Sequence, residues 1–333
     1  MKLIFDLEAD HLLDEVTKVW CIVAKDFETD KVYTFDPDEI QQGLDLLAKA
    51  ELLVGHNIID YDLRVLKKLY DFGYKGEVVD TLVCTRTIWP NLLEVDYKQG
   101  YFPQQLLGRH SLKAWGHRLG VLKGEFGGNT ESFSEYSKAM LDYCVQDCEV
   151  TLALYNKITS KDFSEQALEL EHRLHTLLVE QQEHGFPFNV PEAHKLHVKL
   201  EERRSILEAE LQDTFEPTLV KLKTKTKVIP FNPASRQQIA GRLKKRGWKP
   251  TEFTNTGEAK VDERVLSGID MPEAKLLTEY LMLNKRVGQL ATGNQAWLKL
   301  EKNGRLHGRV NHMGAVTSRC TANNPNLQQV PSI

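Results

Sequence analysis

The chain has 333 residues, a formal net charge of −4, 41% hydrophobic residues and 27% charged residues. This profile is typical of a globular protein, and at roughly 150 residues per domain the length predicts about two domains. The sequence has no apolar run long enough to cross a bilayer, and its first residues, MKLIFDLEAD, include acids and lack the apolar core of a signal peptide. We therefore expect a cytoplasmic protein without a membrane span.

Acidic and basic residues are distributed unevenly along the chain. Residues 1–160 contain 26 Asp and Glu against 17 Lys and Arg, whereas residues 161–333 contain 21 against 26. The sequence pattern changes near the same point, at residues 159–163. We predict an acidic first domain over residues 1–160 and a basic second domain over residues 161–333.

The five cysteines are odd in number and show no disulfide framework. Cys144 and Cys148 are four residues apart, which would place them on one face of a helix. That spacing is compatible with a metal-binding pair, but the sequence has no Cys-x-x-Cys motif and no His-rich cluster nearby. Small buried thiols are the favoured interpretation.

In the first half of the chain, short apolar runs separated by polar turns predict strands. In chain order these runs are KLIFDLEAD, VWCIVAKD, KVYTFD and ELLVGHNII. The segment DYDLRVLKKLYDFG then predicts a helix that ends at Gly73, EVVDTLVCTRTIW begins as a strand or as the end of one, and SLKAWGHRLG predicts a helix that begins after Ser111. Residues 134–158 predict a long helix. Strands first and helices later indicate a layered α/β domain.

The second half of the chain is predicted to be mainly helical. A long helix is expected to end at Gly185, and a second long helix has Pro191 near its start. A shorter helix, ASRQQIAGRLKKRGW, ends at Gly247, and EAKLLTEYLMLNKRVGQLATGNQAWLKL is predicted to form a third long helix. The sequence shows no short-period repeat and no low-complexity segment.

Two acids interrupt the first apolar strand. Asp6 and Glu8 are two residues apart, so a strand would present both on the same face. Adjacent carboxylates repel each other, and a hard divalent cation with oxygen ligands would remove that repulsion. A strand with one solvated face is the alternative, and the Asp-x-Glu pair taken alone would favour it.

Three further polar residues are candidates for the same site. Asp62 follows a predicted strand and begins a predicted helix. Tyr143 and Asp147 are four residues apart, on one face of a predicted helix among apolar neighbours. A helix with ordinary exposed polar residues is the alternative. Asp60 and Asp80 lie near the same run and receive less weight.

This ordered set resembles the DnaQ-like exonucleases of the Asp-Glu-Asp-Asp-Tyr type. The three motifs of that family correspond here to Asp6-Leu-Glu8, to His56-Asn57 through Asp62, and to Tyr143-Cys-Val-Gln-Asp147. Each motif alone is weak, but their order and spacing over residues 1–158 are specific, and SLKAWGHRLG is also similar to the family. The resemblance implies an α/β, RNase H-like (DnaQ-type) domain with a mixed sheet and 3′→5′ exonuclease activity.

The resemblance also implies a two-metal mechanism. Two Mg²⁺ or Mn²⁺ ions about 3.5–4 Å apart would activate water and stabilise the leaving 3′ oxygen. Asp6 would bridge both ions. Glu8 and Asp147 would hold the ion on the water side, and Asp62 would hold the second ion. Tyr143, with an ordinary pKa near 10, would orient the attacking water and not act as a base.

A basic stretch lies in the second half. From Leu219 to Pro250 the sequence has ten Lys and Arg and no Asp or Glu. Such a run is usually a solvated face, but an acid-free stretch of this length favours contact with phosphates. The predicted DNA-binding residues in this stretch are Lys221, Lys223, Lys225, Arg236, Arg242, Lys244 and Lys245.

Residues 305–331, RLHGRVNHMGAVTSRCTANNPNLQQVP, resemble the first polymerase motif of family A DNA polymerases, in particular those of T-odd-like phages. The segments GFPFN, PFNPASRQQI, KVDERVL and EYLMLNKRVG resemble the thumb of that family in the same order. Ser318 replaces the glycine of the family motif. The resemblance implies contact between the motif and a primer–template duplex. The residues to which this applies are Thr317, Arg319, Asn326 and Gln328.

Together, the resemblances imply the proofreading exonuclease part of a DNA-directed DNA polymerase, acting on single-stranded 3′ ends and primer–template DNA. Residues 215–231, where the phage relatives carry a thioredoxin-recruiting insertion, are short and basic, so no thioredoxin partner is expected. The chain ends before the palm and fingers, so we expect no polymerase active site within it and, in a split enzyme, a second polypeptide that supplies them. The alternatives are a nuclease-inactive DNA-binding or assembly subunit and an RNA-processing exonuclease.

Overall fold

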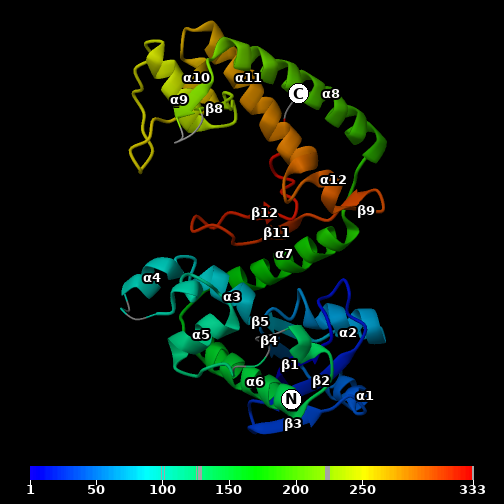
Figure 1. Ribbon diagram of the computed structural model, residues 1–333. Helices are drawn as coiled ribbons and strands as arrows, with labels where there is room; N and C mark the ends of the chain where they lie inside the picture. The colour runs from blue at the N-terminus through cyan, green and yellow to red at the C-terminus, as the bar shows by residue number, and fades with distance from the viewer. Residues whose placement is uncertain (99, 101, 125, 127–129, 222–225, 332–333) are drawn as a thin grey trace. The chain divides into compact units, whose positions relative to one another are not determined.

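The computed structural model describes residues 1–98, 100, 102–124, 126, 130–221 and 226–331 (Figure 1). Two compact units make up the chain. The first comprises Met1–His184 and Arg309–Ala322, and the second comprises Gly185–Gly308 and Asn323–Ile333. Of the predicted DNA-binding residues, Lys223 and Lys225 lie outside the described residues.

A five-stranded mixed sheet lies at the centre of the first unit. Its strands are β1 (Lys2–Ala9), β2 (Val19–Asp26), β3 (Lys31–Phe35), β4 (Leu52–Gly55) and β5 (Glu77–Asp80). The strand order is β3-β2-β1-β4-β5, with antiparallel pairing from β3 to β1 and parallel pairing from β1 to β5. The predicted α/β fold with a mixed sheet is therefore confirmed.

Helices cover both faces of this sheet (Figure 1). The helices of the first unit are α1 (Ile40–Leu47), α2 (Asp62–Tyr70), α3 (Thr81–Ile88), α4 (Leu92–Lys98), η1 (Gln104–Leu106), α5 (Leu112–Leu119), η2 (Thr130–Phe133), α6 (Lys138–Thr159) and α7 (Glu165–His184). The long α6 packs against β1, β2 and β4, and α3 and α5 pack against α6 in turn. On the other face, α1 and α2 bury apolar side chains against the strands.

The alternation of side chains along β1 determines where its acids point. Leu3, Phe5 and Leu7 belong to the buried cluster that α1 and α2 cover. Ile4 belongs instead to the cluster that packs against α6. Asp6 and Glu8 lie two and four residues after Ile4, so their side chains point to the same face of the sheet as Ile4, the face that packs against α6.

Local capping explains where two of these helices begin and end. The Ser111 hydroxyl accepts a hydrogen bond from the Ala114 backbone N–H, which starts α5, and Gly120 ends that helix with a left-handed φ of 72°. α2 ends earlier than the sequence predicted. Its left-handed cap is Asp71, with φ 51°, and not Gly73. Aspartate tolerates this conformation, because its short side chain can hydrogen-bond locally.

A segment from the far end of the chain belongs to the first unit. The strands β11 (Arg309–Asn311) and β12 (Thr321–Asn323) pair into a two-stranded sheet. β11 packs against α7, which itself packs against α3. These contacts extend the first unit past residue 160, where composition placed the domain boundary, to His184. Composition and charge carry no information about such long-range packing.

The second unit is mainly helical. Its elements are β6 (Phe186–Pro187), α8 (Val190–Thr214), β7 (Thr218–Lys221), β8 (Thr226–Ile229), α9 (Arg236–Lys245), α10 (Glu263–Ser267), α11 (Pro272–Val287), the π-helical η3 (Gly288–Thr292), α12 (Trp297–Leu300), β9 (Glu301–Lys302) and β10 (Arg305–Leu306). The helices α8 and α11 pack together, and α9 contributes Ile239 and Leu243 to the shared core. None of the described helices has both the length and the apolar character needed to cross a membrane.

Candidate active site

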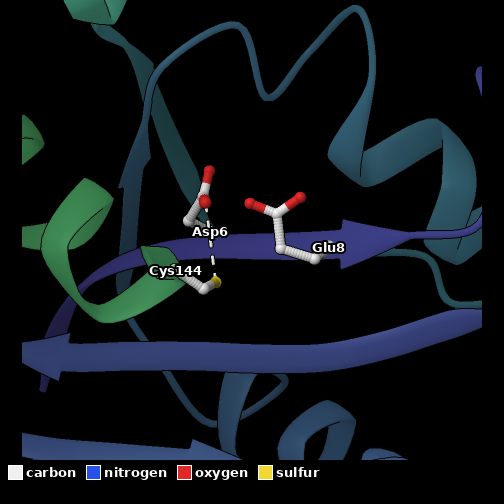
Figure 2. A group of neighbouring side chains, drawn as sticks. All are labelled: Asp6, Glu8 and Cys144. Carbon is white, nitrogen blue, oxygen red and sulfur yellow. Dashed lines mark hydrogen bonds between the residues drawn. The ribbon is translucent and has the colours of Figure 1, made fainter. Parts of the chain in front are cut away.

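Asp6 and Glu8 lie on one side of β1, beside Cys144 of α6 (Figure 2). One oxygen of each carboxylate and the Cys144 sulfur all lie within 4.8 Å of one another. The Cys144 thiol donates a hydrogen bond to Asp6 Oδ2 over 3.5 Å. This shared face follows from the two-residue period of the strand.

Asp62 and Asp147 bring two further carboxylates to the same place. Asp62 is the first residue of α2 and is 4% exposed, and Asp147 lies one turn beyond Cys144 in α6 and is 2% exposed. The negative charge of Asp6 raises the pKa of Asp62 and of Asp147, so both side chains lie within its electrostatic reach. The other three carboxylates that the sequence singled out thus all lie within electrostatic reach of Asp6.

Burial and mutual repulsion oppose ionisation of this group. Burial raises the pKa of Asp6 to about 6 and that of Asp147 to about 7. Burial and then the charge of Asp6 raise the pKa of Glu8 to about 10, and the same two causes raise the pKa of Asp62 well above its ordinary value. Four neighbouring acids in this state, of which Asp62 and Asp147 are buried, need bound protons or a cation.

Lys123 places one positive charge among these acids. Its ammonium forms an ion pair with Asp147 Oδ2 and lies 4.6 Å from the ring centroid of Tyr143. The charge of Lys123 lowers the pKa of Asp6 and of Glu8, but burial outweighs it in both cases. Within the described residues, Asp147 Oδ1 is buried without a hydrogen-bond partner, so this oxygen is still open to a ligand.

A cavity of about 990 Å³ adjoins the carboxylates, because Lys123 and Tyr143 form part of its wall. Cationic and aromatic side chains are prominent in its lining. They are Arg86, Arg109, Lys113, Lys123, Phe126 and Tyr143. The start of α5 also lines the cavity. Such a lining can bind phosphates by charge and bases by stacking.

Asp80 fixes the turn that leads from β4 to Asp62. Its carboxylate, which is fully buried, accepts hydrogen bonds from the backbone N–H groups of Asn57, Ile59 and Leu82. The backbone N–H of Asp80 in turn donates to His172 Nε2 of α7 over 2.9 Å. Asp80 is thus a structural neighbour of the carboxylate site.

Sequence reasoning missed two neighbours of the carboxylates. Cys144 was interpreted as a small buried thiol, with a Cys144–Cys148 metal pair as the alternative, although it stands three residues before Asp147 and therefore on nearly the same helix face. All five cysteines are free, and Cys144 is buried. Lys123 lies in the irregular segment after α5, where no periodicity predicts the direction of a side chain.

The predicted DNA-binding residues are divided between the two units. Thr317 and Arg319 lie in the connection between β11 and β12, in the first unit, whereas Asn326 and Gln328 follow β12 in the second. On α9, Arg242 donates a hydrogen bond to Thr218. The other described basic candidates are exposed: Lys221 at the end of β7, and Arg236, Lys244 and Lys245 of α9.

Comparison with known proteins identifies the family. Residues 197–333 match the model of DNA polymerase family A. Over 99% of its length the chain is 32% identical to the DNA-directed DNA polymerase of Escherichia phage T7, and it is equally similar to that of Enterobacteria phage T3. The chain is similar to DNA polymerases of family A. The family prediction made from residues 305–331 is thereby confirmed.

The chain spans 63% of the length of its T7 and T3 relatives. It is also 24% identical to DNA polymerase I of Aquifex aeolicus, over 91% of this chain and 51% of that protein. Its fold is similar to that of the POL domain of Pol1 from M. smegmatis, solved in complex with DNA primer-template and dNTP. The TM-score is 0.65 at 14% identity, over 99% of this chain and 52% of that one.

Proposed function

We propose that the first unit is an RNase H-like (DnaQ-type) 3′→5′ exonuclease that removes nucleotides from DNA, and that it proofreads for a DNA-directed DNA polymerase. The observation that carries the proposal is that β1, α2 and α6 place Glu8, Asp62 and Asp147 within electrostatic reach of Asp6, and that Asp62 and Asp147 are buried. The mixed sheet with β1 at its centre supports the fold assignment. The sequence similarity to the DNA-directed DNA polymerases of T7 and T3 supports DNA as the substrate.

The residues of the site fit a pair of hard divalent cations. Oxygen donors dominate, as magnesium and manganese require. The buried Asp147 Oδ1 has no partner within the described residues, and burial raises the pKa of Asp6 and of Asp147 even though Lys123 lowers both, so a further cation would favour ionisation of these acids. Asp6, Glu8, Asp62 and Asp147 would hold the ions. When bound, two such ions activate water and stabilise a leaving 3′ oxygen.

The remaining chemistry belongs to side chains of the chain itself. Burial raises the pKa of Tyr143, so its hydroxyl stays protonated and can orient a water molecule by hydrogen bonding. The ammonium of Lys123, between Asp147 and the Tyr143 ring, adds positive charge close to where a scissile phosphate would lie. Arg86, Arg109 and Lys113 line the adjoining cavity and would hold the backbone of a single strand.

The second unit would contribute binding to duplex DNA. Its proposed contacts are Lys221, Lys223, Lys225, Arg236, Arg242, Lys244, Lys245, Asn326 and Gln328, together with Thr317 and Arg319 of the β11–β12 connection. Lys221, Arg236, Lys244 and Lys245 are exposed, as contact with phosphates requires. In this proposal the unit holds the primer–template while the first unit removes a misplaced 3′ nucleotide.

The decisive experiment removes the two acids of β1. Asp6→Ala with Glu8→Ala should lower magnesium-dependent degradation of single-stranded DNA from its 3′ end by at least ~10³-fold, equivalent to about 4 kcal/mol of barrier. DNA binding should persist, because the basic residues are untouched. Asp38→Ala with Asp45→Ala is the matched control, since both of these acids are exposed on the same unit. Undiminished digestion by the purified D6A/E8A protein would refute the proposal.

A further inference from the structure

Residues 309–322 come from the part of the chain that matches the polymerase family model, yet they belong to the compact unit that carries the carboxylates. β11 packs against α7. His312, which follows β11, is 1% exposed, and its ring centroid lies 4.9 Å from that of His175 in α7. The segment is therefore an anchored part of the first unit, and not a loop that merely passes over it.

One ion pair connects this segment to the turn before α2. The Arg309 guanidinium donates to Asp60 Oδ2, and the Asp60 side chain is only 8% exposed. Arg64 approaches the same carboxylate from α2 at 3.5 Å and pairs with Glu183 of α7 at 2.8 Å. The Asp60 carboxylate thus forms ion pairs with Arg309 of β11 and with Arg64 of α2.

The turn that contains Asp60 couples the position of Asp60 to that of Asp62. Within this turn the backbone N–H of Tyr61 donates to Asn57 O, and that of Leu63 donates to Ile58 O. Asp60 and Asp62 are two residues apart in this closed, hydrogen-bonded segment, and Asp62 is the first residue of α2. A shift of Asp60 therefore moves the carboxylate that α2 presents to the site.

We propose that Arg309 is a positioning residue, which acts through Asp60 to hold the 57–63 turn and hence Asp62 in place for catalysis. The inference rests on the proposed exonuclease function. On this inference β11, which lies in the part of the chain that matches the polymerase family model, helps to position a carboxylate of the proposed nuclease site. None of the three exonuclease motifs includes this strand. A ligand or a neighbouring part of the polymerase that engaged Arg309 would loosen the same turn, because an arginine paired elsewhere no longer holds Asp60.

An ordinary surface ion pair would contribute little, because solvent screens it. The Arg309–Asp60 pair differs in that its acid is nearly buried, so removal of the arginine leaves a carboxylate with poor access to water. Arg64 remains nearby after such a change. The expected effect is therefore a local loosening of the turn and not loss of the fold.

The test compares Arg309→Gln, Asp60→Asn, the double variant and Arg309→Lys in the full chain. Hydrogen exchange of the amides of residues 57–63 should rise about fivefold or more in each single variant, and the double variant should add little to either. Arg309→Lys should retain most of the protection. Arg173→Gln is the matched control, because its ion pair with Glu169 lies on the same unit and both of its partners are exposed.

Kinetics separate positioning from general stability. In Arg309→Gln the exonuclease kcat should fall by about fivefold or more with little change in KM, while Arg309→Lys restores most of it. Unchanged exchange at residues 57–63 in Arg309→Gln would overturn the inference, whatever the activity. If that exchange rises but the wild-type protein shows no metal-dependent nuclease activity, the proposed function fails while the structural coupling stands.

Discussion

At the scale of single residues, the pKa shifts of the four acids predict an unusual response to pH. Asp6 and Asp147 have folded-state pKa values of about 6 and about 7, above the values near 4 expected in the unfolded chain. The folded state therefore binds more protons between pH 4 and 7, and its stability falls as the pH rises through that range. In a chelator, the melting temperature should drop by about 5 °C between pH 5 and pH 8.

Divalent cations should reverse this drop, because they replace the protons that the carboxylates lose. Addition of Mg²⁺ or Mn²⁺ should raise the melting temperature more at pH 8 than at pH 5, as thermal melts at the two values can show. The D6A/E8A variant serves as the control. Its melting temperature should change less with pH and should rise less on addition of metal than that of the wild type. A metal response in the wild type that is equal at both pH values would contradict the assignment of these acids as ligands.

Substitution of Tyr143 tests the proposed orientation of the attacking water, separately from metal binding. Tyr143→Phe removes one hydroxyl but leaves the four carboxylates and the ring contacts with Phe126 and Lys123 in place. We expect a fall in exonuclease kcat of about 10–100-fold, well below the loss in D6A/E8A, and unchanged affinity for Mn²⁺. Single-turnover digestion of a labelled oligonucleotide measures the rate. A loss as complete as that of D6A/E8A would assign Tyr143 a role beyond orientation of water.

At the scale of elements, the contact between α7 and the segment after β11 depends on two neutral histidines. The ring nitrogens of His175 and His312 are buried without a hydrogen-bond partner within the described residues. Burial lowers the pKa of His312 to about 3 and also lowers that of His175, whose other charged neighbours are Asp80, Asp60, Arg86 and Arg309. These depressed values mean that the contact is fully stable above about pH 6.5 and weakens as the pH falls toward 3.

This contact predicts that residues 309–322 loosen in mild acid. Hydrogen exchange in that segment should increase between pH 7.5 and pH 5, after correction for the intrinsic rate. His312→Leu should abolish the increase, because an apolar side chain of similar volume has no proton to gain and leaves no unsatisfied polar atom. Equal acid sensitivity in the wild type and in His312→Leu would show that another group controls the segment.

The elements also show what the sequence could and could not predict. Alternation along β1 correctly predicted that Asp6 and Glu8 share a face, and the serine at position 111 correctly predicted the start of α5. Lys123 was not predictable, because an irregular segment has no period that fixes the direction of a side chain. The contact of Arg309 with Asp60 was equally hidden, since the two residues are 249 positions apart and pairing over that distance is a property of the fold.

At the scale of the whole molecule, sequence motifs predicted the family correctly, whereas composition and charge predicted a domain boundary that differs from the division into compact units. The segment at residues 305–331 correctly indicated family A, because its residue pattern is specific. The charge balance placed a boundary at residue 160, whereas the first compact unit continues to His184 and gains Arg309–Ala322. Packing of α7 against α3 and β11 decides this division, and net charge does not report on packing.

The proposed roles of the two units predict how DNA affinity depends on salt. Lys244 and Lys245 are exposed on α9, in the stretch without acids. If both contact phosphates, Lys244→Gln with Lys245→Gln should weaken binding to primer–template DNA for every sequence. The slope of log affinity against log salt should become shallower by roughly 1.8, at about 0.9 per duplex phosphate contact. Fluorescence anisotropy at several salt concentrations measures both quantities.

A matched control makes this result specific to α9. Lys195→Gln with Lys199→Gln changes the charge of the second unit by the same amount, but on a stretch of α8 that also contains Glu192 and Glu201. Its salt slope should remain that of the wild type, because phosphates are repelled where acids accompany the lysines. Exonuclease kcat on saturating single-stranded DNA should be unchanged in both variants, since neither touches the carboxylate site. Equal slopes in the α9 and α8 variants would show that Lys244 and Lys245 form an ordinary solvated face.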